Sequence, residues 1–432
     1  MITHGLINLG FYSIATHLVF FSLPLVATFK GKGTVVLVAL LCLLHLKDFW
    51  ANRSSFKSET IRVSKTCLGI ACIGFLVWCF LSSFWSEFPL RSLTNLSRYG
   101  FLAFLGYCLY KTSILLPPEK KSILSKAFFR GYIFYLSFFL FEIFVFPMAS
   151  KIYADSIQFN SQLFIKGIVN LGFLFWPFLF SLSKYESKIS FSKALLLAAA
   201  LLMFILINAA PDAARAGILL GLSGTLFVYY KPKSAYVFSV IFSVFSVLAP
   251  WIFTSYLTPE TLGSLFHYLP LSYQHRFFIW HEMSKKALES PLIGHGFDYA
   301  TTLAKGPIMC LKKIYFSWQV YPLKFSFSPL VDIGCGHIFT SHPHNGIVQI
   351  WVELGLIGII LFLGIFWLLT SKIVRIKNPA ERVAYFGLLL FYTVIMLVSS
   401  GLWQKWIMAT IILAFVGFCA IKDDLKIPLK KG

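Results

Sequence analysis

Residues 345–370 read NGIVQIWVELGLIGIILFLGIFWLLT, with Glu353 as the single charged residue in the run. A helix needs about 20 mostly apolar residues to cross a hydrocarbon core of roughly 30 Å. This segment is long enough, and a helix is one of the few structures that satisfies its own backbone inside a bilayer. The segment therefore predicts a membrane-spanning helix.

The whole chain shares this apolar composition. Its 432 residues are 58% hydrophobic and 18% aromatic, and only 13% are charged, whereas about 25% are charged in an average soluble domain. This composition excludes a water-soluble enzyme with one membrane anchor, and it excludes a disordered chain. The net charge of +21 lies mostly in short gaps between apolar runs. It therefore indicates membrane orientation, and we expect no nucleic-acid partner.

Twelve apolar windows bounded by charge, Pro or Gly predict an all-α polytopic integral membrane protein with about 12 transmembrane helices. The windows lie near 9–29, 33–46, 67–86, 99–116, 128–149, 162–183, 190–209, 213–230, 235–257, 345–370, 379–399 and 402–421. We expect residues 1–257 to hold helices 1–9 and residues 344–432 to hold helices 10–12 and a cytoplasmic tail. Residues 258–343 should form one large periplasmic loop that contains short helices.

The distribution of Lys and Arg predicts the orientation. Most basic residues fall in 47–66, 117–127, 184–193, 231–234, 371–382 and the tail after 421, which are the inner segments if the N-terminus is cytoplasmic. The outer connections shorter than the large loop carry only Lys30, Lys32, Arg91, Arg98, Lys151 and Lys405. Cytoplasmic loops attract the positive charges, so both ends should lie in the cytoplasm. Residues 1–8 have no basic region, so we expect no removable signal peptide.

The long outer loop has a composition typical of a folded cap. It is rich in aromatic residues, and residues 276–289 alternate Phe277, Trp280 and other apolar residues with lysines. That spacing predicts an amphipathic helix that rests on the bilayer surface. Cys310 and Cys335 also lie in the loop, and an oxidising compartment would let them form a disulfide, although the spacing alone leaves both states open.

Two arginines near the outer membrane edge are candidate anion ligands, because ionisable groups there are costly. Arg215 lies close to the start of the eighth window, and Arg276 begins the amphipathic segment. A guanidinium can bind two phosphate oxygens at once. The alternatives are a snorkelling Arg215 or its pair with Asp212, and a solvated or headgroup-bound Arg276.

The segment Ser341-His342-Pro343-His344-Asn345-Gly346 is a candidate for proton transfer. An imidazole titrates near neutral pH, so His344 at the mouth of the tenth helix could take a proton from a hydroxyl. It could instead cap the helix. A metal site built from the His and Cys residues of the loop is a weaker alternative, since the tight zinc spacing is absent. Those residues are Cys335, His337, His342 and His344.

Several other motifs are missing. The chain has no G-x-x-x-x-G-K-[ST] loop, no dinucleotide-binding fingerprint and no G-x-S-x-G elbow. An ATP-driven pump, a nicotinamide enzyme and an α/β-hydrolase are therefore disfavoured. The acidic pair of a metal-dependent glycosyltransferase is also absent from the outer loops. We therefore expect an enzyme that needs no nucleotide, metal or other cofactor.

His344-Asn345, nine residues, and then Gly355-Leu356-Ile357-Gly358 resemble the H-N-x9-G-x-x-G signature of bacterial O-antigen ligases. The relatives of those ligases are the O-antigen polymerases and the protein O-oligosaccharyltransferases. Residues 215–219 (RAGIL) are similar to the R-x-x-x-L motif of the ligases. The family pattern continues with Thr after the second Gly, where this chain has Ile359.

A third block lies at the start of the large loop. Arg276, Trp280 and Gly294-His295-Gly296 resemble the block that opens the periplasmic loop of the ligases. The three motifs occur in the family's order and on one predicted side. The resemblance covers about residues 190–370, and the twelve-helix layout covers the whole chain.

The resemblance implies a glycosyltransferase of the bacterial inner membrane that works at the periplasmic face. It implies a glycan donor on undecaprenyl diphosphate and a lipid A-core hydroxyl as acceptor, with membrane lipids around the protein. It also implies His344 as general base and Arg215 and Arg276 as diphosphate ligands. His342, Asn345 and Trp280 would be further substrate contacts. Direct attack by the acceptor would invert the anomeric centre.

Three other functions stay open. A polymerase or a protein O-oligosaccharyltransferase would use the same donor with a different acceptor. A transporter of lipid-linked sugar would use the arginines as substrate contacts only. Transport is the weakest, because Glu142 and Glu353 are the main intramembrane acids and no repeat is evident. Arg91 and Arg98 are further candidate headgroup contacts.

Overall fold

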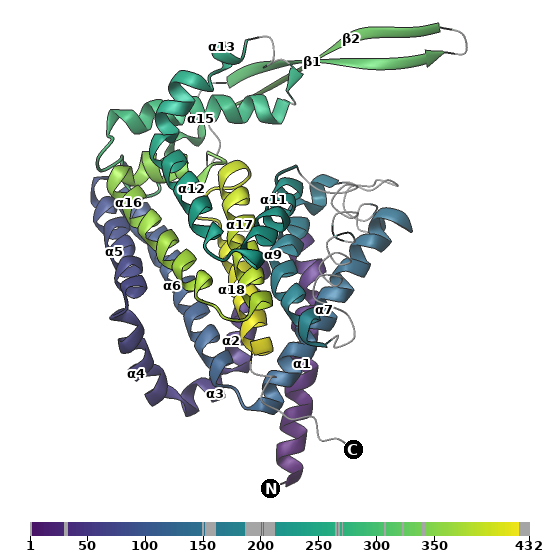
Figure 1. Ribbon diagram of the computed structural model, residues 1–432, viewed down its shortest axis with the longest axis vertical. Coiled ribbons are helices and arrows are strands. Elements are labelled where there is room, and N and C mark those ends of the chain that lie inside the picture. The colour runs from purple at the N-terminus through teal and green to yellow at the C-terminus, as the bar shows by residue number, and fades with distance from the viewer. Residues whose placement is uncertain are drawn as a thin grey trace.

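The computed structural model describes residues 2–29, 33–148, 151, 161–185, 200, 202, 212–263, 266, 268–269, 271–305, 308–321, 324–337 and 343–422. Most of these residues lie in helices, and the long helices form one bundle (Figure 1). The long helices are α1 (Ile2–Phe29), α2 (Gly33–Leu44), α5 (Cys67–Ser82), α6 (Pro89–Leu115), α7 (Pro118–Phe144), α9 (Ser161–Tyr185), α11 (Asp212–Tyr230), α12 (Ser234–Trp251), α16 (Gly346–Val374), α17 (Pro379–Val398) and α18 (Lys405–Lys422).

The multi-pass membrane class is confirmed. Eight described helices are long and apolar enough to cross a bilayer, and Gly33–Leu44 and Lys405–Ile421 are apolar but shorter. Eleven of the twelve predicted windows coincide with a described helix. The window near 190–209 falls almost entirely outside the described residues. The number twelve therefore stays a prediction.

The remaining elements lie at the two ends of the bundle. One end carries α13 (Pro259–Leu262), α15 (Leu271–Glu289), η3 (Tyr299–Lys305) and the strands β1 (Ile308–Tyr321) and β2 (Lys324–His337) (Figure 1). The opposite end carries α3 (Leu46–Ala51) and α4 (Arg53–Ser64). The turns η1 (Ser83–Trp85) and η2 (Ile252–Tyr256) extend α5 and α12. We call the end with α15 the α15 end; it is the predicted outer side.

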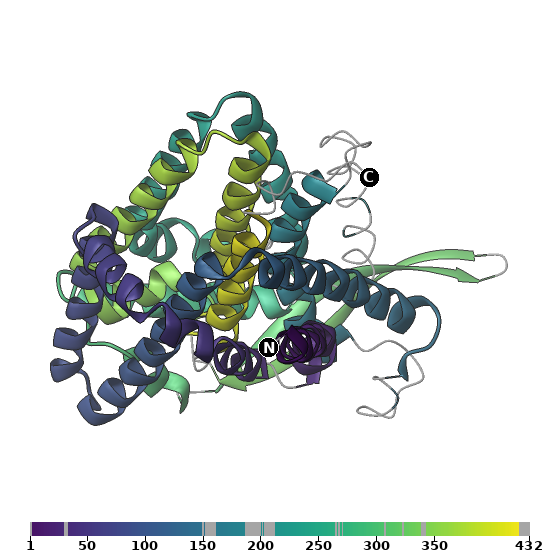
Figure 2. The same cartoon turned by 90° about the horizontal axis from the view of Figure 1, so that it is seen from below.

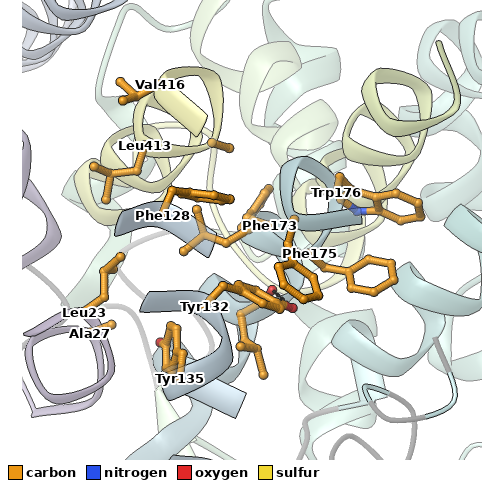
Figure 3. Close-up of a cluster of buried hydrophobic side chains, with 14 of the residues drawn as sticks. Leu23, Ala27, Phe128, Tyr132, Tyr135, Phe173, Phe175, Trp176, Leu413 and Val416 are labelled. Carbon is orange, nitrogen blue, oxygen red and sulfur yellow. Dashed lines mark hydrogen bonds between the residues drawn. The ribbon is translucent and has the colours of Figure 1, made fainter. Parts of the chain in front are cut away.

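Aromatic side chains of α7 and α9 contribute to the core of the bundle. Phe128 and Tyr132 of α7 and Phe173 and Trp176 of α9 are almost completely buried (Figure 3). Tyr132 stacks on Phe178 with ring centroids 4.3 Å apart. The hydroxyls of the buried tyrosines must find acceptors in an apolar interior. Tyr132 donates to the Leu171 carbonyl (3.2 Å) and Tyr135 donates to the Gly167 carbonyl (2.8 Å).

A second core joins the bundle to the α15 end. It combines apolar residues of α5, α12 and α16 with Trp280 of α15 and Phe297 from the following segment. Residues 276–289 are helical as predicted, and the helix begins earlier, at Leu271. Buried residues of α15 such as Met283 belong to this core, so one face of α15 packs against the bundle.

The loop contains one feature that the sequence analysis did not predict. β1 and β2 form an antiparallel hairpin that extends sideways beyond the helices, as both views show (Figures 1 and 2). Residues 314–321 (IYFSWQVY) alternate large apolar with polar residues and are rich in β-forming types, which favours a strand. The described part of the loop contains the expected helices, and it also contains this hairpin. The register of the hairpin pairs Cys310 with Cys335, so the backbone brings together the two cysteines whose pairing the sequence left open.

The tenth predicted helix, α16, is broken at Gly355, where φ is 64° and ψ is −163°. A break frees backbone groups that cannot stay unpaired in an apolar interior. Residues 290–298, which we call the docking loop, supply the partners. The bonds are His295 N to Val352 O (2.8 Å), Gly296 N to Glu353 O (2.9 Å), Leu356 N to Pro291 O (2.8 Å) and Ile357 N to Leu292 O (3.2 Å).

Glycine is required on both sides of this contact. Gly355 and Gly294 both have positive φ, and a Cβ added at either would lie about 2.5 Å from backbone atoms of the other segment. Other residues rarely adopt this conformation, and here they would also clash. The first Gly of the G-x-x-G signature thus allows the break and the docking loop to meet.

We predict that Gly355→Ala destabilises the protein by about 1–3 kcal/mol, because it adds backbone strain and pushes the docking loop away. Thermal unfolding of the detergent-solubilised protein measures the effect. Gly364→Ala is the matched control, since Gly364 lies in the same helix and a Cβ there meets nothing within 4 Å. Equal melting temperatures for the two variants would contradict the role given to Gly355.

Candidate functional site

His344 lies immediately before α16, in a conformation that is unusual for a residue with a side chain. Its φ is +54°, and the next residue, Asn345, is the N-cap of the helix. The Asn345 Oδ1 accepts hydrogen bonds from the N–H groups of Ile347 (3.0 Å) and Val348 (3.1 Å). These donors would otherwise be unpaired at the helix start. The His-Asn pair therefore combines a helix cap with an imidazole held just outside it.

The ring of His344 is fixed by the chain between α17 and α18. Its Nδ1 lies 2.8 Å from the carbonyl oxygen of Ser399, so Nδ1–H donates and Nε2 becomes the basic nitrogen of the ring. Burial lowers the pKa of His344, the Ser399 carbonyl opposes this, and the charges of Arg276 and His275 lower the pKa further. The ring is therefore neutral at neutral pH, as a proton acceptor must be.

Trp280 of α15 supports the backbone beside His344. Its indole Nε1 donates a hydrogen bond of 2.9 Å to the carbonyl oxygen of Pro343. The ring is 7% exposed and packs against Phe253 and Phe277. The contact lets α15 orient the imidazole through the main chain.

Arg215 and Arg276 belong to one polar cluster. Arg215 Nη1 lies 3.3 Å from Asp212 Oδ1, and the Tyr273 hydroxyl donates a hydrogen bond of 2.7 Å to Asp212 Oδ2. The Arg276 guanidinium carbon lies 5.3 Å from the centre of the Tyr273 ring, as in a cation–π contact. We call these four residues the arginine cluster. It connects α11 to α15 and brings together two arginines that are far apart in the sequence.

The electrostatics of the cluster favour a bound anion. The side chain of Arg215 is 38% exposed, and Arg276 is half-buried. Burial lowers the pKa of Arg276, so its positive charge lacks full solvation. Burial, followed by the contact with Asp212, raises the pKa of Tyr273 to about 12, so that its hydroxyl stays protonated. The four residues of the cluster contain one carboxylate and two guanidinium groups, and this formal charge favours an anionic ligand.

A buried carboxylate lies farther along α16. Glu353 accepts hydrogen bonds from Gln349 Nε2 (3.0 Å) and Trp403 Nε1 (2.7 Å) and is fully buried. Gln349 Oε1 in turn accepts from the Leu402 N–H (2.8 Å). Paired groups of this kind make a buried polar network rigid. The network bonds to Leu402 and Trp403. These residues lie in the same connection as Ser399, whose carbonyl orients His344.

The remaining predicted residues have different positions. Asn345 caps α16, and His342 lies outside the described residues. Arg91 forms an ion pair of 3.2 Å with Asp298 of the docking loop, and Arg98 is exposed. Among the described residues, no three His, Cys, Asp or Glu side chains lie close enough together to hold a metal ion.

The sequence analysis did not identify Tyr273 and Trp403. Each of them bonds to an acid that is distant in the sequence, so no local pattern revealed them. Tyr273 precedes Arg276 by one helical turn, and that spacing was the only available signal. Asp212 was considered only as a partner of Arg215, and in the structure it also accepts from Tyr273.

Comparison with known proteins finds sequence similarity to one family. Residues 195–363 match the family model described as O-antigen ligase, and this range contains Arg215, Arg276 and His344. A Rickettsia bellii protein named as a polysaccharide ligase is 27% identical in an alignment of 412 positions, which covers 90% of this chain and 92% of that protein. A Rickettsia conorii protein of the same designation is 24% identical, over 83% of this chain and 80% of its own length. The chain is therefore similar to the O-antigen ligase family over residues 195–363, and to these two proteins over most of its length.

Proposed function

We propose that the protein transfers a glycan from undecaprenyl diphosphate to a hydroxyl of the lipid A-core, at the periplasmic face of the bacterial inner membrane. One observation carries the proposal: the imidazole of His344 is held by the Ser399 carbonyl (2.8 Å), and α15, the helix of Arg276, bonds to the adjacent backbone through Trp280 Nε1 and Pro343 O (2.9 Å). A proton acceptor beside fixed cations is the arrangement that glycosyl transfer from a diphosphate needs. The family and its polysaccharide ligase relatives support a glycosyl-transferring enzyme.

In this proposal the arginine cluster binds the leaving group. The donor diphosphate gains negative charge as its bond to the sugar breaks. Arg215 and Arg276 would neutralise this charge, and the half-buried Arg276 would do so where contacts are stronger than in bulk water. The protonated hydroxyl of Tyr273, which donates to Asp212 (2.7 Å), could donate to a phosphate oxygen instead.

The chemical step needs no added reagent. The acceptor oxygen forms a bond to the anomeric carbon, and the bond from that carbon to the diphosphate oxygen breaks with its electron pair moving to the diphosphate. The acceptor proton passes to Nε2 of His344 and later leaves to solvent. A single displacement of this kind inverts the anomeric centre, and we expect it to proceed without metal or nucleotide.

Two alternatives use the same donor site. A polymerase would supply another lipid-linked glycan as acceptor, and a protein O-oligosaccharyltransferase would supply a serine or threonine hydroxyl. The relatives named as polysaccharide ligases favour a glycan acceptor. A transporter is the weakest alternative, because a lone base with a fixed tautomer has no role in moving an intact lipid-linked sugar.

We predict that His344→Ala lowers the transfer rate by about 10²–10⁴-fold through loss of the base, and that Arg215→Ala lowers it by about 10²–10³-fold. The assay measures transfer by the purified protein in proteoliposomes that contain the lipid-linked donor. His17→Ala and Arg130→Ala are the matched controls. His17 lies on α1 and Arg130 on α7, and the two side chains contact each other and no residue of the candidate site in the described part of the chain. Normal transfer by the His344→Ala protein would refute the base assignment.

A pH profile tests the state of the base. The pKa of His344 is lowered, so the acid limb of kcat/KM should lie below about 6.5, the ordinary value for histidine. Activity should fall as the pH drops through this pKa, because the ring becomes protonated. Arg276→Gln removes one positive charge and should move the acid limb of the residual activity to higher pH. A shift to lower pH would contradict the proximity of the two groups.

The acceptor class is tested by competition in one reaction. Proteoliposomes with labelled donor receive lipid A-core, a serine-rich pilin-like peptide and unlabelled lipid-linked glycan. We expect label on the lipid A-core, and no extension of the lipid-linked glycan. Label on the peptide would identify an oligosaccharyltransferase, and extension of the glycan would identify a polymerase.

A further inference from the structure

A large cavity lies between the helices at the end of the bundle opposite the α15 end. Its volume is about 640 Å³, and α5, α6, α16, α17 and α18 border it. Its lining includes Leu68 at the start of α5 and Lys372 near the end of α16, which place it at the predicted cytoplasmic side. Neither His344 nor a member of the arginine cluster is among its described lining residues. The proposed reaction therefore makes no use of this cavity.

A second cavity adjoins the first, between α6 and α18. Its volume is about 400 Å³, and both cavities are lined by Tyr110, Ile411 and Phe415. The rest of its described lining is Ala103, Gly106, Tyr107, Met408 and Ile412. Carbon groups make up most of both walls, so each space suits a hydrocarbon chain. Two spaces that share one wall suit a lipid with two acyl chains better than a lipid with a single chain.

Two tyrosine hydroxyls indicate what kind of ligand the larger cavity takes. Tyr110 and Tyr385 line it and are half-buried, and within the described part of the chain neither hydroxyl forms a hydrogen bond. The buried Tyr132 and Tyr135, in contrast, donate to main-chain carbonyls. A tyrosine hydroxyl in an apolar interior ordinarily has an acceptor. Tyr110 and Tyr385 therefore indicate a ligand that brings acceptor oxygens into the cavity.

Aromatic neighbours fix the rings of these two tyrosines. Tyr385 stacks on Phe418 with ring centroids 4.1 Å apart, and Tyr110 meets Phe415 edge to face at 6.2 Å. The hydroxyl positions are therefore set before a ligand binds, which lowers the entropic cost of binding. Tyr110 lies near the end of α6 and Tyr385 near the start of α17, at the same end of the bundle as Lys372.

The larger cavity reaches a basic segment of the chain. Lys372 lines it, and Arg375 and Lys377 follow in the connection to α17. All three side chains are exposed, and none of them forms an ion pair with another described residue. Glu381, the acid in the described lining, is only 8% exposed. A phosphate group at the rim would therefore meet exposed cations, as anionic headgroups do at basic sites between membrane helices.

We propose that the two cavities bind one anionic glycerophospholipid of the phosphatidylglycerol type, from the leaflet at this end. Its phosphate lies at Lys372, its ester carbonyl oxygens accept from Tyr110 and Tyr385, and one acyl chain enters each cavity. In such a lipid the ester oxygens lie between the phosphate and the two chains, and the lining has the same order of charged, polar and apolar groups. The site does not depend on the proposed reaction.

Native mass spectrometry of the full-length protein, delipidated in detergent, tests the site. The probes are phosphatidylglycerol, phosphatidylethanolamine and undecaprenyl phosphate, and the affinity of each is measured for wild type and variants. We expect Lys372→Gln to weaken the binding of one phosphatidylglycerol about fivefold to tenfold, and Tyr385→Phe to weaken it about threefold. The affinities of the other two lipids should not respond to Lys372→Gln.

The matched controls are Lys231→Gln and Tyr236→Phe. Both residues lie at the same end of the bundle, and neither is among the described residues that line the two cavities. Each control should bind phosphatidylglycerol as wild type does. Thermal unfolding is the second readout: phosphatidylglycerol should raise the melting temperature of wild type and controls, and raise that of folded Lys372→Gln protein less.

Three outcomes would overturn the inference. An unchanged phosphatidylglycerol affinity in both Lys372→Gln and Tyr385→Phe would exclude the site. Weaker binding of undecaprenyl phosphate by these variants would assign the cavities to the chain of the donor lipid. Phosphatidylethanolamine that binds as tightly as phosphatidylglycerol, and that Lys372→Gln weakens equally, would show that the site does not select an anionic headgroup.

Discussion

The architecture of the site depends on one constraint: a helix that breaks inside an apolar interior must find new partners for its backbone groups. In α16 the break lies at Gly355, and the docking loop supplies these partners. The loop directly follows α15, which carries Arg276. Pairing the break with the loop therefore also sets the position of Arg276 relative to His344 at the start of α16. The same contact therefore pairs the free backbone groups at the break and positions residues of the candidate site.

Much of the fold follows from composition, because apolar length is a strong signal in a membrane. Windows such as 379–399 and 213–230 match α17 and α11 closely. The hairpin was not predicted, since strand pairing between β1 and β2 depends on register that no local pattern reveals. The break at Gly355 was also hidden, because glycine occurs in many membrane helices that remain straight.

The roles of the candidate site residues stay predictions, and only their positions can be compared with the structure. The candidates His344, Arg215 and Arg276 came from residue chemistry and from a family resemblance, and the structure joins the two arginines through Asp212 and Tyr273. The orientation of His344 could not be predicted. It depends on the Ser399 carbonyl, which lies in the connection between α17 and α18, and Glu353 of α16 bonds to this connection through Trp403. Such contacts depend on tertiary packing.

The shared backbone bonds also impose an order on biogenesis. The docking loop precedes α16 in the chain, so it is synthesised before the helix that it pairs with. Its carbonyl groups at Pro291 and Leu292 can be paired only when Leu356 and Ile357 have been added. A nascent protein stopped before residue 356 would therefore lack these bonds as well as α17 and α18.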